Sequence, residues 1–354
     1  MISIKPNVLY VRDQNTKKFI PLLAIKGAQG DQGPPGTSDL GEVNSELETI
    51  TNALKLLYGG GTLGLEYQLD GETYTVTSVG DAKNNTEIII PPSISGIPVT
   101  KIKKSAFVNC SNLTSVTLPE SIEEIGSNAF NHCYKLVEVI NKSTLNDIEK
   151  GEDSYGYIAR YALEIHAEDS KIVTQGDYQF YAYDGVNYLV NYTGDDTEIT
   201  LPENNSDYSD YVINKYMFRD SKVTSVTIPD SVTEIFKEAF YSCDSLTSVK
   251  IGNSVKRIGS SAFSGCYNLT SVTIGNSVTH IGDYAFDGCE NLTSITIPKS
   301  ITNIGNTAFL DCNKITNIYY QGTQTEWDAI NIHESNESFI NAVTIHYESP
   351  LPEV

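Results

Sequence analysis

The feature that most constrains this chain is an internal repeat of 23 residues. The six cysteines fall into two series at this spacing: Cys110 and Cys133, then Cys243, Cys266, Cys289 and Cys312. Four consecutive copies begin at positions 228, 251, 274 and 297, an earlier one begins at 118, and a partial copy precedes that one. A single copy of this length cannot bury its own hydrophobic face, so the copies must stack into a solenoid with a continuous core.

Each copy combines a strand pattern with a return segment. Leu269, Val272 and Ile274 reproduce the L-x-x-L-x-L spacing of leucine-rich repeats, whose period lies between 20 and 29 residues. The following I-G-x-x-A-F-x-x-C segment brings its apolar residues to one side, which predicts one or two helical turns behind the strand. We therefore expect an α/β repeat solenoid. A serine that can bond turn backbone follows each strand: Ser121, Ser231, Ser254, Ser277 and Ser300.

The repeat unit S-V-x-x-I-G-x-x-A-F-x-x-C-x-x-L-T-S-V-T-I resembles the BspA-like leucine-rich repeat family. The resemblance covers about residues 65–348, including the closing segment that starts with YYQGTQTEWDAINI. It implies a solenoid fold and a binding role, because members are typically bacterial or protist surface proteins proposed to bind host proteins or other cells. No catalytic residues come with the motif, so fold analogy implies a binding module and little more.

The aligned cysteines allow two interpretations. Neighbouring turns about 4.8 Å apart do not exclude a disulfide bridge, and a ladder of small buried apolar side chains is the simpler alternative. No C-x-x-C motif occurs and the five histidines are scattered, so we expect no metal and no cofactor. The sequence also lacks G-x-S-x-G, P-loop and H-E-x-x-H motifs, which predicts a protein that is not an enzyme.

The charge and the apolar runs exclude further classes. The net charge is −21, which makes nucleic acid an improbable partner, because binding to phosphates requires clustered Lys and Arg. No stretch approaches the roughly 18 apolar residues of a membrane span, so we expect no membrane insertion. The first residues, MISIKPNVLYVRDQ, contain no apolar run typical of a secretory signal, so we expect no export through that route.

A tyrosine-rich acidic segment, residues 141–215, interrupts the repeats. Its stretch DYQFYAYDGVNYLVNY alternates aromatic and polar residues around Asp184 and Gly185, which predicts a β-hairpin. Exposed tyrosines can bind sugars or proteins, or the rings can instead pack the hairpin onto the solenoid. The candidate ligand-binding tyrosines are Tyr178, Tyr181, Tyr183, Tyr188 and Tyr192.

The strands should expose the residues between the buried ones. On the later repeats these are Ser271, Thr273, Ser294 and Thr296, which we take as further candidate ligand-binding residues. A repeating polymer such as a glycan suits a repeating surface, although a generic β-surface has the same composition.

The residues before the repeats have the pattern of an oligomeric neck. Glycine recurs at every third position beside a Pro-Pro pair, at Gly27, Gly30, Gly33 and Gly36. A heptad seam follows at Leu40, Val43, Leu47, Ile50, Leu54 and Leu57. Both patterns suit three chains, so we expect a short collagen-like and coiled-coil trimeric neck. Alternatively, the helix caps the first solenoid turn.

The first 36 residues resemble the N-termini of tail fibre and baseplate-associated proteins of phages that infect Gram-positive bacteria. This resemblance implies a virion protein that forms a homotrimer, attaches to other tail or baseplate proteins and binds a bacterial surface glycan or protein. The alternative is an extracellular or cell-surface adhesin that binds host proteins. The expected domains are a docking hairpin (1–26), the collagen-like stretch (27–37), the coiled coil (38–61), a first repeat block (62–140), the interruption (141–215), a second repeat block (216–319) and a C-terminal cap (320–354).

Overall fold

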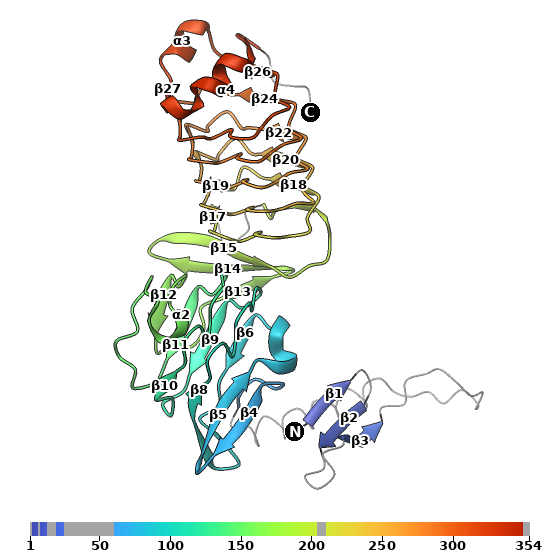
Figure 1. Ribbon diagram of the computed structural model, residues 1–354, viewed down its shortest axis with the longest axis vertical. Coiled ribbons are helices and arrows are strands. Elements are labelled where there is room, and N and C mark those ends of the chain that lie inside the picture. Colours follow the sequence, from blue (N-terminus) through green and yellow to red (C-terminus); the bar gives the residue numbers. More distant parts are fainter. Residues whose placement is uncertain (1, 6–7, 13–18, 25–59, 204–209, 350–354) are drawn as a thin grey trace, which may run out of the picture. The chain divides into compact units, whose positions relative to one another are not determined.

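The computed structural model describes residues 2–5, 8–12, 19–24, 60–203 and 210–349 (Figure 1). The chain divides into two compact units, Met1–Ser170 and Lys171–Val354. The predicted collagen-like stretch, the heptad seam and every residue expected to trimerise them lie outside the described residues.

The first strands form a small antiparallel sheet in the order β1-β2-β3, drawn in dark blue in Figure 1. β2 (Val8–Arg12) and β3 (Phe19–Ala24) are the two strands that the sequence predicts around a polar turn, and β1 (Ile2–Lys5) pairs with β2 as an additional edge.

The N-terminal unit contains two further sheets around one hydrophobic core. One has the order β10-β8-β5-β4, with β7 also paired to β8; the other has the order β12-β11-β9-β6. The strands of the first are β4 (Glu66–Asp70), β5 (Thr73–Ser78), β7 (Ser93–Ile94), β8 (Ile97–Ile102) and β10 (Glu124–Ile125). Those of the second are β6 (Glu87–Ile89), β9 (Ser115–Leu118), β11 (Glu138–Asn141) and β12 (Glu164–His166). The short helices are η1 (Gly80–Asn84) and α2 (Ser154–Tyr157).

The C-terminal unit is a longer stack in which most strands pair in parallel. Its largest sheet has the order β13-β14-β15-β17-β19-β21-β23-β25-β27. These strands are β13 (Val173–Gln175), β14 (Tyr178–Tyr183), β15 (Val186–Tyr192), β17 (Tyr211–Ile213), β19 (Val232–Ile235), β21 (Arg257–Ile258), β23 (His280–Ile281), β25 (Asn303–Ile304) and β27 (Asn331–Ile332). The predicted hairpin is confirmed, because β14 and β15 pair antiparallel across Asp184 and Gly185.

The opposite side of this unit consists of two smaller sheets, β16-β18-β20-β22 and β24-β26-β28. Their strands are β16 (Glu198–Thr200), β18 (Ser225–Ile228), β20 (Ser248–Ile251), β22 (Ser271–Thr273), β24 (Ser294–Ile297), β26 (Asn317–Tyr320) and β28 (Thr344–His346). The helices α3 (Gln324–Asp328), η2 (Glu334–Asn336) and α4 (Glu337–Ala342) lie among the last strands (Figure 1).

The expected helical return is wrong: in each repeat the A-F-x-x-C segment forms tight turns, and the fold is a β-solenoid. Two residues of each copy adopt left-handed backbone angles, such as Ser261 (φ 54°) and Gly265 (φ 74°), and left-handed residues interrupt an α-helix. The N–H of Phe263 donates to the carbonyl of Ala285 in the next copy at 2.8 Å, where a helix would bond within its own turn. The turns thus add a third hydrogen-bonded side to the stack.

The phenylalanine of each copy stacks on the next inside the solenoid. Ring centroids from Phe218 to Phe309 lie 4.8–5.6 Å apart with nearly parallel planes, and Phe339 of α4 stacks on Phe309 at 5.1 Å. The rings from Phe218 to Phe309 are almost fully buried, so this ladder supplies a large part of the buried apolar area that holds the copies together.

The boundary between the units falls inside the predicted interruption, residues 141–215. β12 pairs with β11 and extends the N-terminal stack, whereas β15 pairs with β17 and begins the C-terminal one. The interruption is therefore not one domain, because its two halves close one stack and open the other.

Candidate binding surface

The strand face of the C-terminal unit is the outer surface of β16-β18-β20-β22 and β24-β26-β28. Parallel pairing in register aligns equal positions of successive repeats, so that Ser225, Ser248 and Ser271 form one row. The Ser248 hydroxyl donates to Ser225 Oγ at 2.9 Å, which shows that members of the row touch.

The four predicted strand-face residues differ in accessibility. Ser271 is exposed, Thr273 and Ser294 are half-buried, and Thr296 is only 7% exposed. Thr296 is therefore wrong as a ligand contact, because a side chain covered by its neighbours offers no area to a partner. It lies in register with Tyr319, whose exposed ring continues the face.

The end of the strand face carries an aromatic pair, Tyr319 and His346. The strand alternation places Tyr319 on this face, whereas the sequence analysis made no prediction for His346. The rings of Tyr319 and His346 stack with centroids 4.9 Å apart, and His346 Nε2 lies 2.8 Å from Asn317 Oδ1. β28 brings His346 to this position from outside the 23-residue repeats, which is why repeat spacing alone did not indicate it.

The hairpin tyrosines fall into two groups. Tyr178 and Tyr192 are partly buried against the core of the C-terminal unit, with ring centroids 5.0 Å apart. Tyr183 and Tyr188 are half-buried, and Tyr188 packs edge-to-face with Phe236. Tyr181 has no exposed area, so it is wrong as a candidate contact.

The partly buried tyrosines have raised pKa values. Burial, followed by repulsion from a neighbouring Tyr192 phenolate, raises the pKa of Tyr178 to about 12. Its hydroxyl donates to the carbonyl of Thr200 at 3.2 Å. A neutral ring that bonds its own backbone serves packing more directly than recognition.

The turn face of the C-terminal unit is formed by residues 237–245, 260–268, 283–291 and 306–314. It exposes Tyr267 by 47%, Tyr284 by 39% and Leu310 by 45%, while Tyr241 is half-buried. Backbone bonds such as Gly288 N–H to Leu310 O at 2.8 Å hold successive turns side by side. The sequence analysis assigned this segment to a helix and therefore missed these exposed residues.

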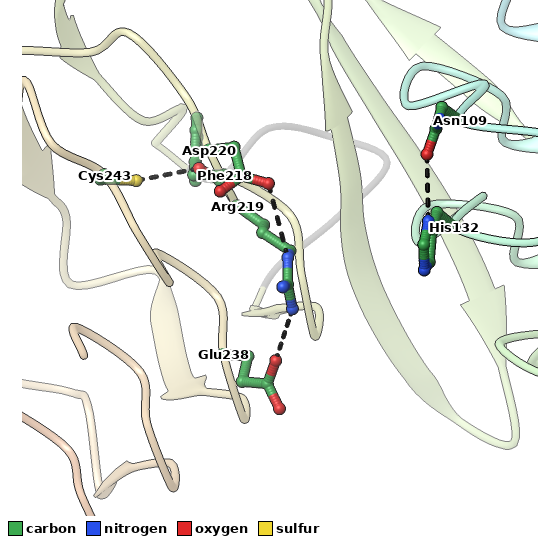
Figure 2. A network of polar contacts seen from close by, with 7 residues as sticks. All are labelled: Asn109, His132, Phe218, Arg219, Asp220, Glu238 and Cys243. Carbon is green, nitrogen blue, oxygen red and sulfur yellow. Dashed lines mark hydrogen bonds and ion pairs between the residues drawn. The ribbon is translucent and has the colours of Figure 1, made fainter. Parts of the chain in front are cut away.

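An arginine at the start of the turn face shows how the face holds a cation (Figure 2). The Arg219 guanidinium carbon lies 4.5 Å from the centroid of the Tyr241 ring, and Nη1 lies 2.7 Å from Glu238 Oε2. Asp220 Oδ2 adds a contact at 3.5 Å. An aromatic face and a carboxylate thus bind the same guanidinium, as expected for cation–π contacts reinforced by an ion pair.

Acidic groups further along the turn face have fewer partners. The Ser264 hydroxyl donates to Asp287 Oδ2 at 3.2 Å. Burial, and to a lesser extent repulsion from Asp311, raises the pKa of Asp287, while the bond from Ser264 lowers it. Among the described residues no ion pair involves either carboxylate, so this end of the face is electrostatically uncompensated.

A buried polar cluster in the N-terminal unit has the wrong order for a catalytic triad. Ser115 and Ser170 donate hydroxyl hydrogen bonds to Glu138 Oε2 at 2.7 and 2.6 Å, and His166 Nε2 lies 3.1 Å from Glu138 Oε1. A triad requires the imidazole between hydroxyl and carboxylate, whereas here the carboxylate lies between the other two groups. The arrangement gives the buried Glu138 side chain polar partners, in an order that does not match a triad.

The six cysteines are free and buried. The thiols of Cys133, Cys243, Cys266, Cys289 and Cys312 donate to the phenylalanine carbonyl of the preceding copy, for example from Cys266 to Phe240 at 3.2 Å. Contact with the Cys243 thiol, together with burial, raises the pKa of Cys266. The sequence left open a disulfide bridge or a ladder of small buried side chains, and in the structure the cysteines form the ladder.

The described residues contain neither a cluster of metal ligands nor a membrane-spanning helix. No group of three or more potential metal ligands lies together in these parts of the chain. No helix described here is long and apolar enough to cross a bilayer.

Comparisons with known proteins identify the family of the repeats. Residues 81–184 and 211–336 match six copies of the BspA type leucine rich repeat region. No curated protein matches the chain. Among solved structures it is similar to a leucine rich cell surface protein from Faecalibacterium prausnitzii, with 22% identity over 76% of this chain and 96% of that one and a TM-score of 0.44.

Two further solved structures are similar. A Treponema pallidum leucine rich repeat protein has 24% identity over 71% of this chain and 88% of its own, with a TM-score of 0.29. A leucine-rich repeat protein from Bacteroides capillosus has 26% identity over 43% of this chain and all of its own, with a TM-score of 0.31. Because the family match spans more than half of the residues, the chain belongs to the BspA-type leucine-rich repeat family.

Proposed function

We propose that this protein is an adhesin-like binding protein that acts at a cell surface and uses the outside of its C-terminal solenoid as the binding surface. The observation that carries the proposal is the register of the parallel strands, which aligns equal positions of successive repeats into continuous rows. Such rows offer a partner an extended platform, in contrast to the concave pocket of a small-molecule enzyme.

Family membership supports the same role. The resemblance to BspA-type repeats implies a surface protein that binds other proteins or cells. The repeat motif supplies no catalytic residues. The proposed partner is a host protein, and binding requires no cofactor and no metal. A polymeric glycan is the second class of ligand that a repeating row of hydroxyls would suit.

The proposal is tested by binding the purified full-length chain to immobilised extracellular matrix proteins, to host cells and to whole bacteria. A Ser271→Lys/Ser294→Lys variant changes the strand face, and an Asn303→Lys/Asn331→Lys variant makes the same charge change on the largest sheet. If the strand face is used, we expect only the first variant to lose about tenfold or more in affinity. Failure of the unmodified chain to bind any of these surfaces would contradict an adhesin role.

A second setting is proposed from residues 27–57 of the sequence. Glycine at every third position followed by a heptad seam favours a trimer, and with the resemblance of the first 36 residues this favours a phage tail adhesin that binds bacteria. The two settings share the solenoid as binding surface and differ in oligomeric state and partner. The whole-bacteria arm of the binding experiment separates the partners.

A further inference from the structure

The Arg219 contact provides a template for what the turn face can bind. Its guanidinium lies over the Tyr241 ring of the neighbouring turn. It also pairs with the Glu238 carboxylate of that turn (Figure 2). Lys237 Nζ also lies 3.3 Å from Glu238 Oε1, so this first acid is matched by cations of the chain itself. The ring and the acid therefore form a saturated cation site.

The same combination recurs in the following turns without a basic residue in contact. Tyr267 directly follows the repeat cysteine. The equivalent residue is Asp244 in the preceding copy and Glu290 in the next copy. Tyr284 follows Asp283 directly, and Asp287 lies in the same turn. Among the described residues, no ion pair involves these four carboxylates.

Besides Lys237, the turn face contains one basic residue, Lys314, and its ammonium group is otherwise engaged. Lys314 Nζ donates to Asn291 Oδ1 at 2.5 Å, and the structure gives it no ion pair in the described parts of the chain. The turn face thus has more acids than bases exactly where its rings are exposed, a charge distribution complementary to a basic partner.

The two rings make few contacts that the structure shows, such as the hydrogen bond from Asn306 Nδ2 to the Tyr284 hydroxyl at 3.4 Å, and both residues stay exposed. Tyr284 has a left-handed backbone (φ 57°), a conformation that favours glycine or asparagine, and 39% of its side chain is exposed. Tyr267 is 47% exposed, and its ring lies against the next turn, since a Cβ atom at Gly288 would be 3.6 Å from its Cε1. An aromatic residue that stays exposed, at Tyr284 on a left-handed backbone, points to a contact with a partner.

We propose that the turn face binds a basic segment of a protein partner, with arginine or lysine side chains over Tyr267 and Tyr284 and ion pairs to Asp244, Asp283, Asp287 and Glu290. Leu310 extends the patch with an apolar contact at its end. The inference rests on the proposed binding role and names the chemistry of its partner. Arg219 on Tyr241 is the intramolecular counterpart of the contact that the partner would make.

The test uses the full-length chain and a short synthetic peptide of alternating arginine and glycine, with a glutamate–glycine peptide as its charge-reversed control. Binding is measured by calorimetry at low and at high salt. A Tyr267→Ser/Tyr284→Asn variant removes the rings, and Tyr319→Ser removes an exposed ring from the strand face. We expect the first variant to weaken arginine-peptide binding about fivefold to tenfold and the second to leave it unchanged.

Carboxylates are tested separately, because a chain of net charge −21 attracts any basic peptide weakly. An Asp244→Asn/Glu290→Gln variant neutralises the two acids beside Tyr267, whereas Glu72→Gln/Glu198→Gln removes two exposed acids elsewhere. We expect the first pair to weaken binding several times more than the second. Equal losses from both pairs would mean unspecific attraction and would overturn the proposal.

Two other results would also overturn it. One is arginine-peptide binding that the Tyr267→Ser/Tyr284→Asn variant leaves unchanged. The other is binding of a neutral oligosaccharide that this variant abolishes while the peptide does not bind. If either result occurs while binding to matrix proteins or cells is intact, only the proposal of a basic partner is rejected and the adhesin role stands. Failure of the unmodified chain to bind any of these surfaces would contradict the adhesin role itself.

Discussion

At the scale of single residues, Thr307 combines two unfavourable features. Its φ of 43° is left-handed, which is costly for a β-branched side chain, and its buried hydroxyl oxygen has no hydrogen-bond partner in the described parts of the chain. The same repeat position in the N-terminal unit holds Asn128, with φ 58°. Asparagine tolerates this conformation, so Thr307 is a weak point of the turn ladder.

We expect Thr307→Asn to stabilise the protein by about 0.5–1 kcal/mol, because the substitution relieves backbone strain and supplies an amide for hydrogen bonding. Urea unfolding of both proteins measures the difference. Thr316→Asn is the control, since Thr316 is exposed and has no left-handed backbone, and it should change stability little. A Thr307→Asn variant less stable than the parent would show that the threonine fits this turn.

The raised pKa of Tyr178 predicts a loss of stability at alkaline pH. Its pKa is about 12 in the folded chain, against about 10 when unfolded, so the unfolded state loses this proton first. The contribution of Tyr178 is complete below pH 10 and disappears as the pH rises through 12. We expect Tyr178→Phe to flatten the fall of the melting temperature in this range. An unchanged slope, together with phenolate absorbance that titrates near pH 10, would contradict the assignment.

Some properties of single residues could be predicted from the sequence, and others depended on packing. The cysteine period indicated buried, aligned side chains, because equal positions of a repeat share one environment. Tyr181 was misassigned because it lies outside the repeat, in the hairpin. The alternation of residues along a hairpin indicates which side chains share a face, but it does not indicate whether other parts of the chain cover that face. Thr296 was misassigned for a related reason, since its larger neighbour Tyr319 lies in the next strand.

At the scale of the repeat element, one glycine column controls how closely the copies stack. A Cβ atom at Gly282 would lie 2.6 Å from the backbone nitrogen of Ser260 and 2.7 Å from the carbonyl carbon of Gly259. Gly126, Gly259 and Gly305 are similarly tight. Phe236 holds this position in the copy that follows the hairpin, and its ring packs on Tyr188.

We expect Gly282→Ala to destabilise the C-terminal unit by about 1–3 kcal/mol, since the added methyl group must push apart two backbone segments. Thr293→Ala, at an exposed position of the same stack, should change stability by less than about 0.5 kcal/mol. Both values come from chemical unfolding followed by circular dichroism. Wild-type stability in Gly282→Ala would show that neighbouring copies can separate without loss.

The helix expected at A-F-x-x-C shows what a hydrophobic pattern leaves undetermined. Ile281, Ala285, Phe286 and Cys289 do share the buried side, as the spacing predicted. A series of tight turns places the same side chains inward, however, because two left-handed residues per copy change the path of the backbone. Serine, tyrosine and glutamate at those positions give no sign of this conformation, whereas the glycines at 265 and 288 and the asparagines at 109 and 128 do.

At the scale of the whole molecule, the repeats predicted the stacking and the core, but the candidate site only in part. The strand face follows from the two-residue alternation of the strands, so Ser271 and Ser294 could be placed on it. The turn face depended on the conformation of the turns and on exposure, which the helix assignment hid. His346 comes to the strand face through β28, a parallel partner far from the repeats in sequence.

The neck hypothesis makes the last prediction, which concerns oligomeric state. If residues 27–57 form a three-chain neck, the intact protein should have a native mass of about three times 38.9 kDa. A truncated chain that begins at Gly61 should be a monomer, because the remaining units bury their apolar residues within one chain. Native mass spectrometry of both chains measures this directly.

A Leu47→Asp/Leu54→Asp variant provides the matched control within the full-length chain. Charges at two positions of the heptad seam should dissociate a trimer into monomers. Among the described residues the solenoid cores begin at Leu65, so we expect the melting of the solenoid units to stay unchanged. A monomeric intact chain would contradict the trimeric tail adhesin and leave the monomeric surface adhesin. A trimer that survives removal of residues 1–60 would instead place the interface on the solenoid itself, where it would compete with the binding surfaces proposed above.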